Sequence, residues 1–296
     1  MLVNKAAEID DAVAHLLVAI YEVLHPYPKH CHNFCELTVT LSGTADHEIN
    51  EDRHITSAGD VYIFTGNESH CFHNPTDFRV AVVQFSRKVF GSAKSELDQR
   101  PGFRALFELE PRARAAHGYE SRLKLVPRDL EYVWRMLEEM QRELAEMPLS
   151  ADLLSKTVFI HLCAFLANRY EQGMHIPKVR SLNKIGEVLN YMETHLCEPF
   201  TLKGLGELVG ISPRTLLRDF RTCMHTSPVS HLIRLRVERA CEWLAQSNWS
   251  TLDIALEVGF NSPEYFCRKF RQLMGMSPTE YRNSCSAGYR PSPNGT

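Results

Sequence analysis

Three histidines and one glutamate in the first quarter of the chain are the residues whose types and spacing could do chemistry. His30, His32 and Glu36 follow one another at even spacing, and His70 comes later. Alternate side chains of a β-strand point to the same face, so the first three would share a face if they lie on one strand. Three imidazoles and one carboxylate suit a divalent transition metal such as Zn, Ni, Fe or Mn, with open positions for water or a ligand.

The sequence that must position these residues is typical of β-structure. Short segments rich in Val, Ile, Thr, Tyr and Phe alternate with turn residues such as Ser42-Gly43 and Asn74-Pro75. Short strands at this spacing predict a sandwich or barrel. The predicted strands are Glu36–Leu41, Asp46–Asn50, Asp60–Phe64 and Phe78–Phe85.

The order of these residues resembles the two motifs of the cupins, which implies a small β-barrel over roughly residues 15–90. The resemblance is carried by His30, His32, Glu36 and Gly43, and then by Gly59, His70 and Asn74. The sequence departs from the motifs in having Leu24 and Asn67 at glycine positions and Thr65 at a proline position.

Three interpretations of the set His30, His32, Glu36 and His70 stay open: a metal site, a metal-free pocket that hydrogen-bonds an effector, and a purely structural cluster. His47, His54 and His73 could extend a metal site, but exposed loop histidines are the commoner explanation. By the same alternation, Cys31, Cys35 and Cys71 should face away from the set.

A helical period follows between Pro127 and Gly173, where apolar residues recur at steps of three and four. Two helices joined at Met147-Pro148 form a predicted αα-hairpin. The hairpin could either pack on the β domain or form a dimer interface. The basic stretch from Gly173 to Arg180 breaks the period and is predicted to be the linker between domains.

The last hundred residues contain an internal repeat. Ser212–Pro228 aligns without a gap on Ser262–Pro278, and eight of the 17 positions are identical. In the first copy a short helix begins after Thr201 and stops at Gly210, and Gly206 would let a second helix cross closely. Ser212 caps that second helix and Pro213 occupies its first turn. This is the helix-turn-helix pattern.

The outward face of the second helix is basic in both copies, which favours an interaction with the major groove of DNA over a bundle with solvated arginines. The helix between the copies, roughly 227–246, would hold both reading helices on one face of the DNA, about 34 Å apart. The predicted DNA-binding residues are Arg214, Thr215, Arg218 and Arg221, and Glu264, Tyr265, Arg268 and Arg271.

The repeat resembles the DNA-binding domain of the AraC/XylS transcription regulators over about 100 residues. The resemblance is carried by the run from Ile254 to Phe260 and by Tyr265-Phe266, Arg268-Lys269-Phe270, Gly275, Ser277-Pro278 and Tyr281-Arg282. It implies seven helices with two such units, promoter DNA as partner and contact with RNA polymerase. The spacing of His30, His32, Glu36 and His70 also resembles regulators of sugar use such as the rhamnose and chitobiose types, which implies a mono- or oligosaccharide effector.

Composition excludes other classes. The 296 residues hold no apolar run long enough for a transmembrane helix, and the first residues do not resemble a signal peptide. Nine cysteines without a C-x-x-C pair favour a reducing, cytoplasmic setting. The formal net charge of −3 gives no sign of nucleic acid, so DNA binding rests on local pattern alone.

We therefore expect a multi-domain α+β protein that is a DNA-binding transcription regulator, acts as a homodimer, is controlled by a small-molecule effector and is not an enzyme. The alternatives are a metal-dependent cupin enzyme fused to a DNA-binding domain and a ligand-independent DNA-binding protein with a degenerate barrel. The expected domains are a cupin-like effector-binding domain at 1–125, a helical hairpin at 126–173, a linker at 174–182, a double helix-turn-helix domain at 183–285 and a disordered tail at 286–296.

Overall fold

A computed structural model describes residues 16–66, 68–117, 121–146, 151–173 and 175–286. The chain divides into two compact units, the N-terminal unit (residues 1–186) and the C-terminal unit (residues 187–296). The predicted disordered tail lies almost wholly outside the described residues. No helix among the described residues is long and apolar enough to cross a membrane.

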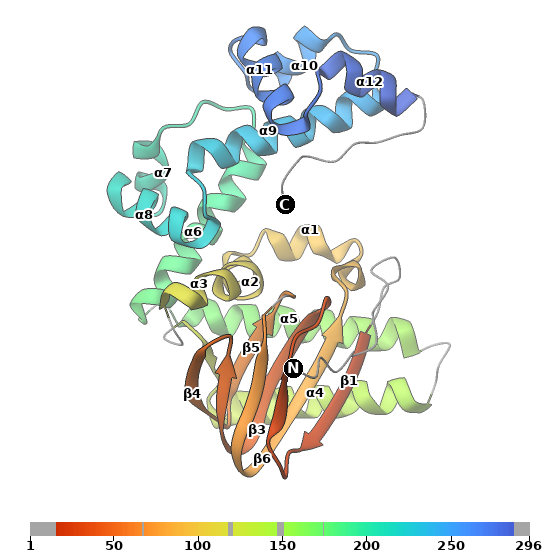
Figure 1. Cartoon of the computed structure of the whole chain (residues 1–296), viewed down its shortest axis with the longest axis vertical. Helices are drawn as coiled ribbons and strands as arrows, with labels where there is room; N and C mark the ends of the chain where they lie inside the picture. The colour runs from red at the N-terminus through yellow and green to blue at the C-terminus, as the bar shows by residue number, and fades with distance from the viewer. Residues whose placement is uncertain (1–15, 67, 118–120, 147–150, 174, 287–296) are drawn as a thin grey trace. The chain divides into compact units, whose positions relative to one another are not determined.

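The N-terminal unit is built on one seven-stranded antiparallel sheet (Figure 1). Its main path runs β1-β6-β3-β5-β7, while β2 pairs with β6 and β4 pairs with β3. The two longest strands, β3 and β6, therefore form the centre of the sheet. The strands are β1 (Leu16–Glu22), β2 (Tyr27–His30), β3 (Cys35–Ile49), β4 (Asp52–Ser57), β5 (Asp60–Phe64), β6 (His70–Phe85) and β7 (Leu123–Lys124).

Long bent strands replace several of the short strands predicted from the sequence. The predicted strands 36–41 and 46–50 are both parts of β3, which carries register shifts against β6 between Thr40 and Asp46. Gly43 lies in this stretch with φ of 69°, and a Cβ there would meet the Asp77 carbonyl oxygen at 2.2 Å. Glycine therefore permits the bend, and the bend lets one strand pair with β5 at one end and with β4 at the other.

Helices follow the sheet along the chain, and the predicted αα-hairpin is confirmed. It consists of α4 (Pro127–Glu146) and α5 (Ala151–Gln172), although its Met147-Pro148 turn lies outside the described residues. Both helices lie across the sheet (Figure 1). The Phe159 ring of α5 lies 4.9 Å from the Phe85 ring of β6, so the hairpin packs on the β-structure. The shorter elements are η1 (Arg87–Phe90), α1 (Ala93–Asp98), α2 (Pro101–Arg104), η2 (Ala105–Leu109) and α3 (Glu110–His117).

The segment predicted as a linker is largely helical. Residues 177–182 begin α6 (Pro177–Thr194), a helix in which the boundary between the two units also falls. Pro177 occupies the first helical position, which suits proline because that position needs no amide donor. The basic residues between 178 and 180 therefore belong to a helix start, while the domain limits themselves stay a prediction.

The C-terminal unit contains the predicted pair of helix-turn-helix units. Thr201 caps α7 and Ser212 caps α8, each by accepting a hydrogen bond from the backbone amide three residues on. Ser262 caps α11 in the same way, and φ is positive at both predicted turn glycines, Gly210 and Gly259. The helices are α7 (Leu202–Leu208), α8 (Pro213–Met224), α9 (Pro228–Gln246), α10 (Thr251–Glu257), α11 (Pro263–Met274) and α12 (Pro278–Ser286).

Gly206 has a more local role than the sequence predicted. A Cβ at this position would lie 2.6 Å from the Ile211 carbonyl oxygen and 3.5 Å from the Pro213 nitrogen. The close approach is therefore made by the turn between the helices and the start of α8, while Leu216 and Phe220 of α8 are buried. In the second helix-turn-helix unit, Phe266, Phe270 and other apolar residues form a core with α9 and α10.

Candidate functional site

The four predicted site residues come together from separate elements of the N-terminal unit. The expectation that His30, His32 and Glu36 share one strand is wrong: His30 ends β2, His32 lies in the following loop, and Glu36 is near the start of β3. His70 opens β6 and pairs with His30 in the sheet register. The loop between β2 and β3 therefore does the positioning that strand alternation was expected to do.

The cluster has the dimensions of a metal site. The Nε2 atom of His32 lies 3.6 Å from Glu36 Oε2, and Nε2 of His70 lies 3.8 Å from Glu36 Oε1. With metal–ligand bonds of about 2.0–2.3 Å, ligand atoms at the corners of a tetrahedron lie roughly 3.3–3.8 Å apart. His32, Glu36 and His70 each offer one ligand atom, and these three atoms lie within 4.8 Å of one another. The His30 and His70 rings are 4.3 Å apart, centre to centre.

A backbone hydrogen bond fixes the tautomer of His32, whereas His30 interacts with the backbone of both Pro28 and His70. Nδ1 of His30 lies 3.1 Å from the Pro28 carbonyl oxygen, and Nδ1 of His32 donates to the Phe34 carbonyl at 2.9 Å. A neutral ring that donates through Nδ1 keeps its lone pair on Nε2, which is the form that ligates metals. Nε2 of His32 and both ring nitrogens of His70 are buried without a hydrogen-bond partner among the described residues.

Burial sets the charge states of the cluster. It raises the pKa of Glu36 to about 7, although Thr38 donates a hydrogen bond to this carboxylate at 3.1 Å and partly opposes the rise. Burial also lowers the pKa of His30 and His32, and holds the pKa of His70 well below its ordinary value. The imidazoles are therefore neutral donors facing a carboxyl group, and a divalent cation at the centre would satisfy both.

A cavity of about 380 Å³ reaches three of these residues, His30, Glu36 and His70. His32 is absent from its lining, and its Nε2 faces Glu36 Oε2 whereas Nε2 of His70 faces Oε1. Sequence reasoning missed Tyr21, Tyr27 and Gln84, which line the same space. The pairing of β6 with β3 places Gln84 directly opposite Glu36, and the pairing of β1 with β6 brings Tyr21 to the same space.

The other histidines of the sheet are not exposed loop residues. His47 is fully buried on β3, where burial holds its pKa well below the ordinary value. Nε2 of His54 on β4 lies 2.7 Å from the Tyr62 hydroxyl, and burial lowers the pKa of His54 to about 4. His73 is half-buried on β6 beside Cys71.

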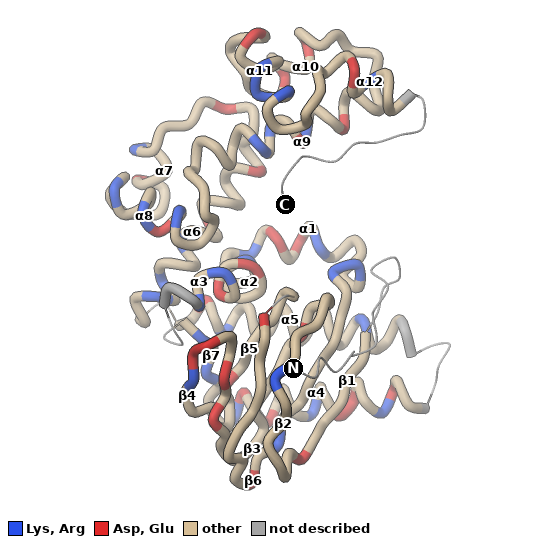
Figure 2. The backbone as a smooth tube through the Cα atoms, viewed as in Figure 1, with Lys and Arg blue, Asp and Glu red and all other residues tan. Residues whose placement is uncertain are grey.

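Helices α8 and α11 of the C-terminal unit carry the predicted basic faces (Figure 2). Arg214, Arg218 and Arg221 are exposed on α8, on the side away from its buried Leu216 and Phe220. Arg218 Nε donates to the neighbouring Asp219 carboxylate at 2.8 Å. Thr215 is only half-buried, and its hydroxyl hydrogen-bonds the capping Ser212 at 2.9 Å.

On the corresponding face of α11, side chains contact one another. Glu264, Arg268 and Arg271 are exposed, and the Arg268 guanidinium lies 5.2 Å from the centre of the Tyr265 ring. Stacking of this kind restricts the arginine and presents its donors outward. Glu264 accepts a hydrogen bond from the capping Ser262 at 2.7 Å, so it takes part in the start of the helix.

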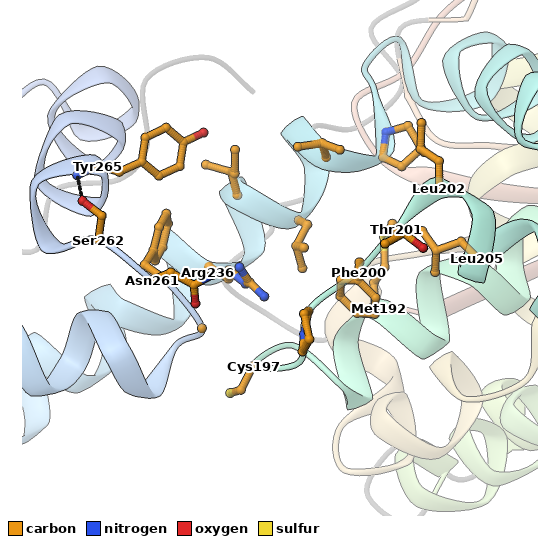
Figure 3. A pocket seen from close by; sticks show the side chains of 17 residues that line it. Met192, Cys197, Phe200, Thr201, Leu202, Leu205, Arg236, Asn261, Ser262 and Tyr265 are labelled. Carbon is orange, nitrogen blue, oxygen red and sulfur yellow. Dashed lines mark hydrogen bonds between the residues drawn. The ribbon is translucent and has the colours of Figure 1, made fainter.

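A cavity of about 500 Å³ lies between the two helix-turn-helix units, and Figure 3 shows its walls. Tyr265 lines this cavity, so its side chain is only partly exposed to solvent beside Arg268. Arg236 of α9 also lines the cavity. Its guanidinium donates hydrogen bonds to the backbone carbonyls of Leu196 at 2.9 Å and Glu198 at 2.8 Å. Sequence reasoning did not identify Arg236, because its partners are backbone atoms forty residues away along the chain.

Comparisons with known proteins match both units. Residues 16–162 match the AraC-like ligand binding domain, and residues 205–284 match a helix-turn-helix domain. The HTH-type transcriptional activator RhaS of Escherichia fergusonii is 24% identical over 262 residues, which cover 88% of this chain and 89% of that protein. RhaS of Enterobacter sp. is 23% identical with the same coverage.

Among solved structures, the chain is similar to the DNA-binding domain of AdpA in complex with a target DNA. That domain is 33% identical and covers 36% of this chain and 95% of its own, with a TM-score of 0.35.

Proposed function

Because the chain belongs to the AraC family of transcription regulators, we propose that a small molecule bound in the cavity of its N-terminal unit controls how helices α8 and α11 bind promoter DNA. The observation that carries this proposal is the cavity itself, which is lined by His30, Glu36 and His70 together with Tyr21, Tyr27 and Gln84. A site of this size with a few convergent polar groups suits a small ligand.

The ligand we propose is a mono- or oligosaccharide. The tyrosine rings offer apolar faces of the kind that sugar rings stack on, and the Gln84 amide offers both donors and an acceptor for hydroxyl groups. The buried imidazoles and carboxyl group supply further directional contacts at the base of the cavity. A sugar satisfies such a mixed apolar and polar lining better than a purely apolar molecule does.

The residues of the cluster fit a divalent transition metal, and we propose that His32, Glu36 and His70 hold it with His30 alongside. The Nε2 atoms of His32 and His70, buried without a hydrogen-bond partner among the described residues, and the fixed tautomer of His32 support this assignment. When bound, such a metal would supply a Lewis acid toward an oxygen atom of the ligand. The chain's own residues orient the ligand and exclude water. We propose binding rather than turnover here, since the relatives are transcriptional activators.

DNA recognition is proposed for the exposed arginines of the two reading helices. Helix α9 has 19 residues, so at 1.5 Å per residue it spans roughly 28 Å between them. This length is comparable to the roughly 34 Å that separates successive major-groove turns. We further propose that the protein acts as an activator through RNA polymerase, that it functions as a homodimer, and that it works in the cytoplasm, since nine cysteines without a C-x-x-C pair suit a reducing compartment.

Ligand binding tests this proposal. The full chain is titrated with a panel of monosaccharides and disaccharides, with and without divalent metal, and its thermal midpoint is followed. We expect one sugar to raise the midpoint, because a ligand that binds only the folded state stabilises it. Glu36→Gln should lose the response, whereas Glu51→Gln, an exposed change in the β3–β4 turn, should keep it. An equal response in both variants would remove the cluster from the site.

A further inference from the structure

A second group of metal-ligating side chains lies on the same sheet, away from the effector cavity. Glu48 on β3 pairs directly with Cys71 on β6, and His73 follows Cys71 by two residues. Residues paired across an antiparallel sheet and residues two apart on one strand share a face, so all three side chains lie on one side of the sheet. That side is opposite to the one on which His70 and Phe72 line the cavity.

The distances within this group are those of a preformed ligand set. Cys71 Sγ lies 3.2 Å from His73 Nε2, and His73 Nε2 lies 3.5 Å from Glu48 Oε2. All three ligand atoms lie within 4.8 Å of one another, as in the first cluster. Two of the three separations are therefore close to the edge of a tetrahedral zinc site.

We propose that Glu48, Cys71 and His73 form a second metal site, which takes a divalent ion of the zinc class. One thiolate, one imidazole and one carboxylate are a donor set for borderline metals, and three protein ligands leave a fourth position for water. Binding converts the Cys71 thiol to a thiolate and releases its proton to solvent. The bound ion would cross-link β3 to β6 from the side opposite the effector cavity.

Two cations compete with the ion for Glu48. Lys29 Nζ lies 3.0 Å from Glu48 Oε1, and Arg53 Nη2 lies 2.9 Å from Glu48 Oε2. Both cations are about half exposed, and exposed ion pairs of this kind are weak. The metal can therefore displace them, and removal of Lys29 should tighten metal binding.

Cobalt(II) distinguishes this site from the first cluster, because only thiolate ligation gives an intense sulfur-to-cobalt charge-transfer band in the near ultraviolet. The full chain, reduced with a non-thiol reductant, is titrated with cobalt chloride and then with zinc chloride. We expect the band to appear with cobalt and to disappear as zinc displaces it. No charge-transfer band in the wild-type protein would overturn the proposal.

Matched variants assign the band to this site. Cys71→Ser and His73→Ala should abolish or strongly weaken it, and His73 tolerates the change because a third of its side chain is exposed. Cys31→Ser, which alters an exposed cysteine of the same unit, and His32→Ala should both keep it. Lys29→Met should lower the cobalt concentration at half-saturation. A band that persists in Cys71→Ser would show that other cysteines bind the metal and would refute the site.

Discussion

His32 Nε2 faces Glu36 Oε2 at 3.6 Å inside the N-terminal unit, too far apart for a hydrogen bond and close enough to share a cation. The Nδ1 hydrogen bond to Phe34 leaves a lone pair on the facing nitrogen. A lone pair opposite a carboxylate is unfavourable, and a divalent cation between the two atoms would remove this repulsion. The cluster therefore suits a metal, because the facing nitrogen and oxygen could both bind one cation.

Removal of the histidine ligands should remove one metal ion from each protomer. We expect His30→Ala/His32→Ala, made in a Cys71→Ser background, to lose the ion that the Cys71→Ser protein retains, because two imidazole donors disappear. Elemental analysis after purification without chelator measures the content. Equal metal content in the two proteins would leave His30, His32, Glu36 and His70 as a metal-free polar pocket.

Arg268 should be a major determinant of sequence-specific DNA binding. Arg268→Ala is expected to weaken binding to the specific site by roughly 1–3 kcal/mol, the usual worth of one good bidentate contact with a base. A gel-shift titration at fixed salt on a site obtained by selection from random DNA measures this loss. Arg135→Ala, an exposed change on α4, is the control and should have no effect. Wild-type affinity in Arg268→Ala would contradict the assignment of α11.

The serine cap of α11 should contribute measurably to the stability of the C-terminal unit. Ser262 accepts a hydrogen bond from the Tyr265 amide at 3.2 Å, so Ser262→Ala leaves that donor without its partner. The expected loss in the free energy of unfolding is about 1 kcal/mol. Urea unfolding followed by circular dichroism measures it, with the exposed Thr279→Ala as control. If both variants unfold at the same urea concentration, the cap has no such role.

Arg114 should contribute strongly to the stability of the N-terminal unit. Its guanidinium donates to Glu110 at 2.8 Å, to Glu68 at 3.1 Å and to the Ile63 carbonyl at 2.7 Å, and both Arg114 and Glu110 are buried. Arg114→Met leaves the Glu110 carboxylate buried without its cation, which costs about 3–5 kcal/mol.

Chemical denaturation compares this variant with Arg135→Met, which breaks an exposed pair with Glu131 and should change stability by less than about 1 kcal/mol. Similar small losses in both variants would show that Glu110 is solvated or protonated when Arg114 is absent.

The helix starts and turns of the C-terminal unit could be predicted from sequence because their signals are local. Ser212-Pro213 and Ser262-Pro263 mark helix starts, and Gly210 and Gly259 mark the turns before them, because capping and positive φ depend on neighbouring residues only. The hairpin at 127–173 was predictable for the same reason. Its role as a dimer interface stays a prediction.

The N-terminal site depended on contacts that sequence does not encode locally. The four residues of the cluster were predicted, but the loop that carries His32 was not, since even spacing alone does not show where a strand ends. Tyr21 reaches the cluster through the pairing of β1 with β6, and Gln84 reaches it through the pairing of β6 with β3, contacts that join residues some fifty to sixty apart in the chain. The burial of His47 likewise follows from the sheet as a whole.

The coupling between the cavity and DNA is the central claim, and fluorescence anisotropy of labelled DNA with and without the sugar tests it most directly. With the sugar that stabilises the wild-type chain, we expect the DNA dissociation constant to change by about 5- to 150-fold, the usual range of allosteric coupling. In Glu36→Gln the dissociation constant should no longer depend on the sugar. A wild-type dissociation constant that is the same with and without the bound sugar would contradict the account.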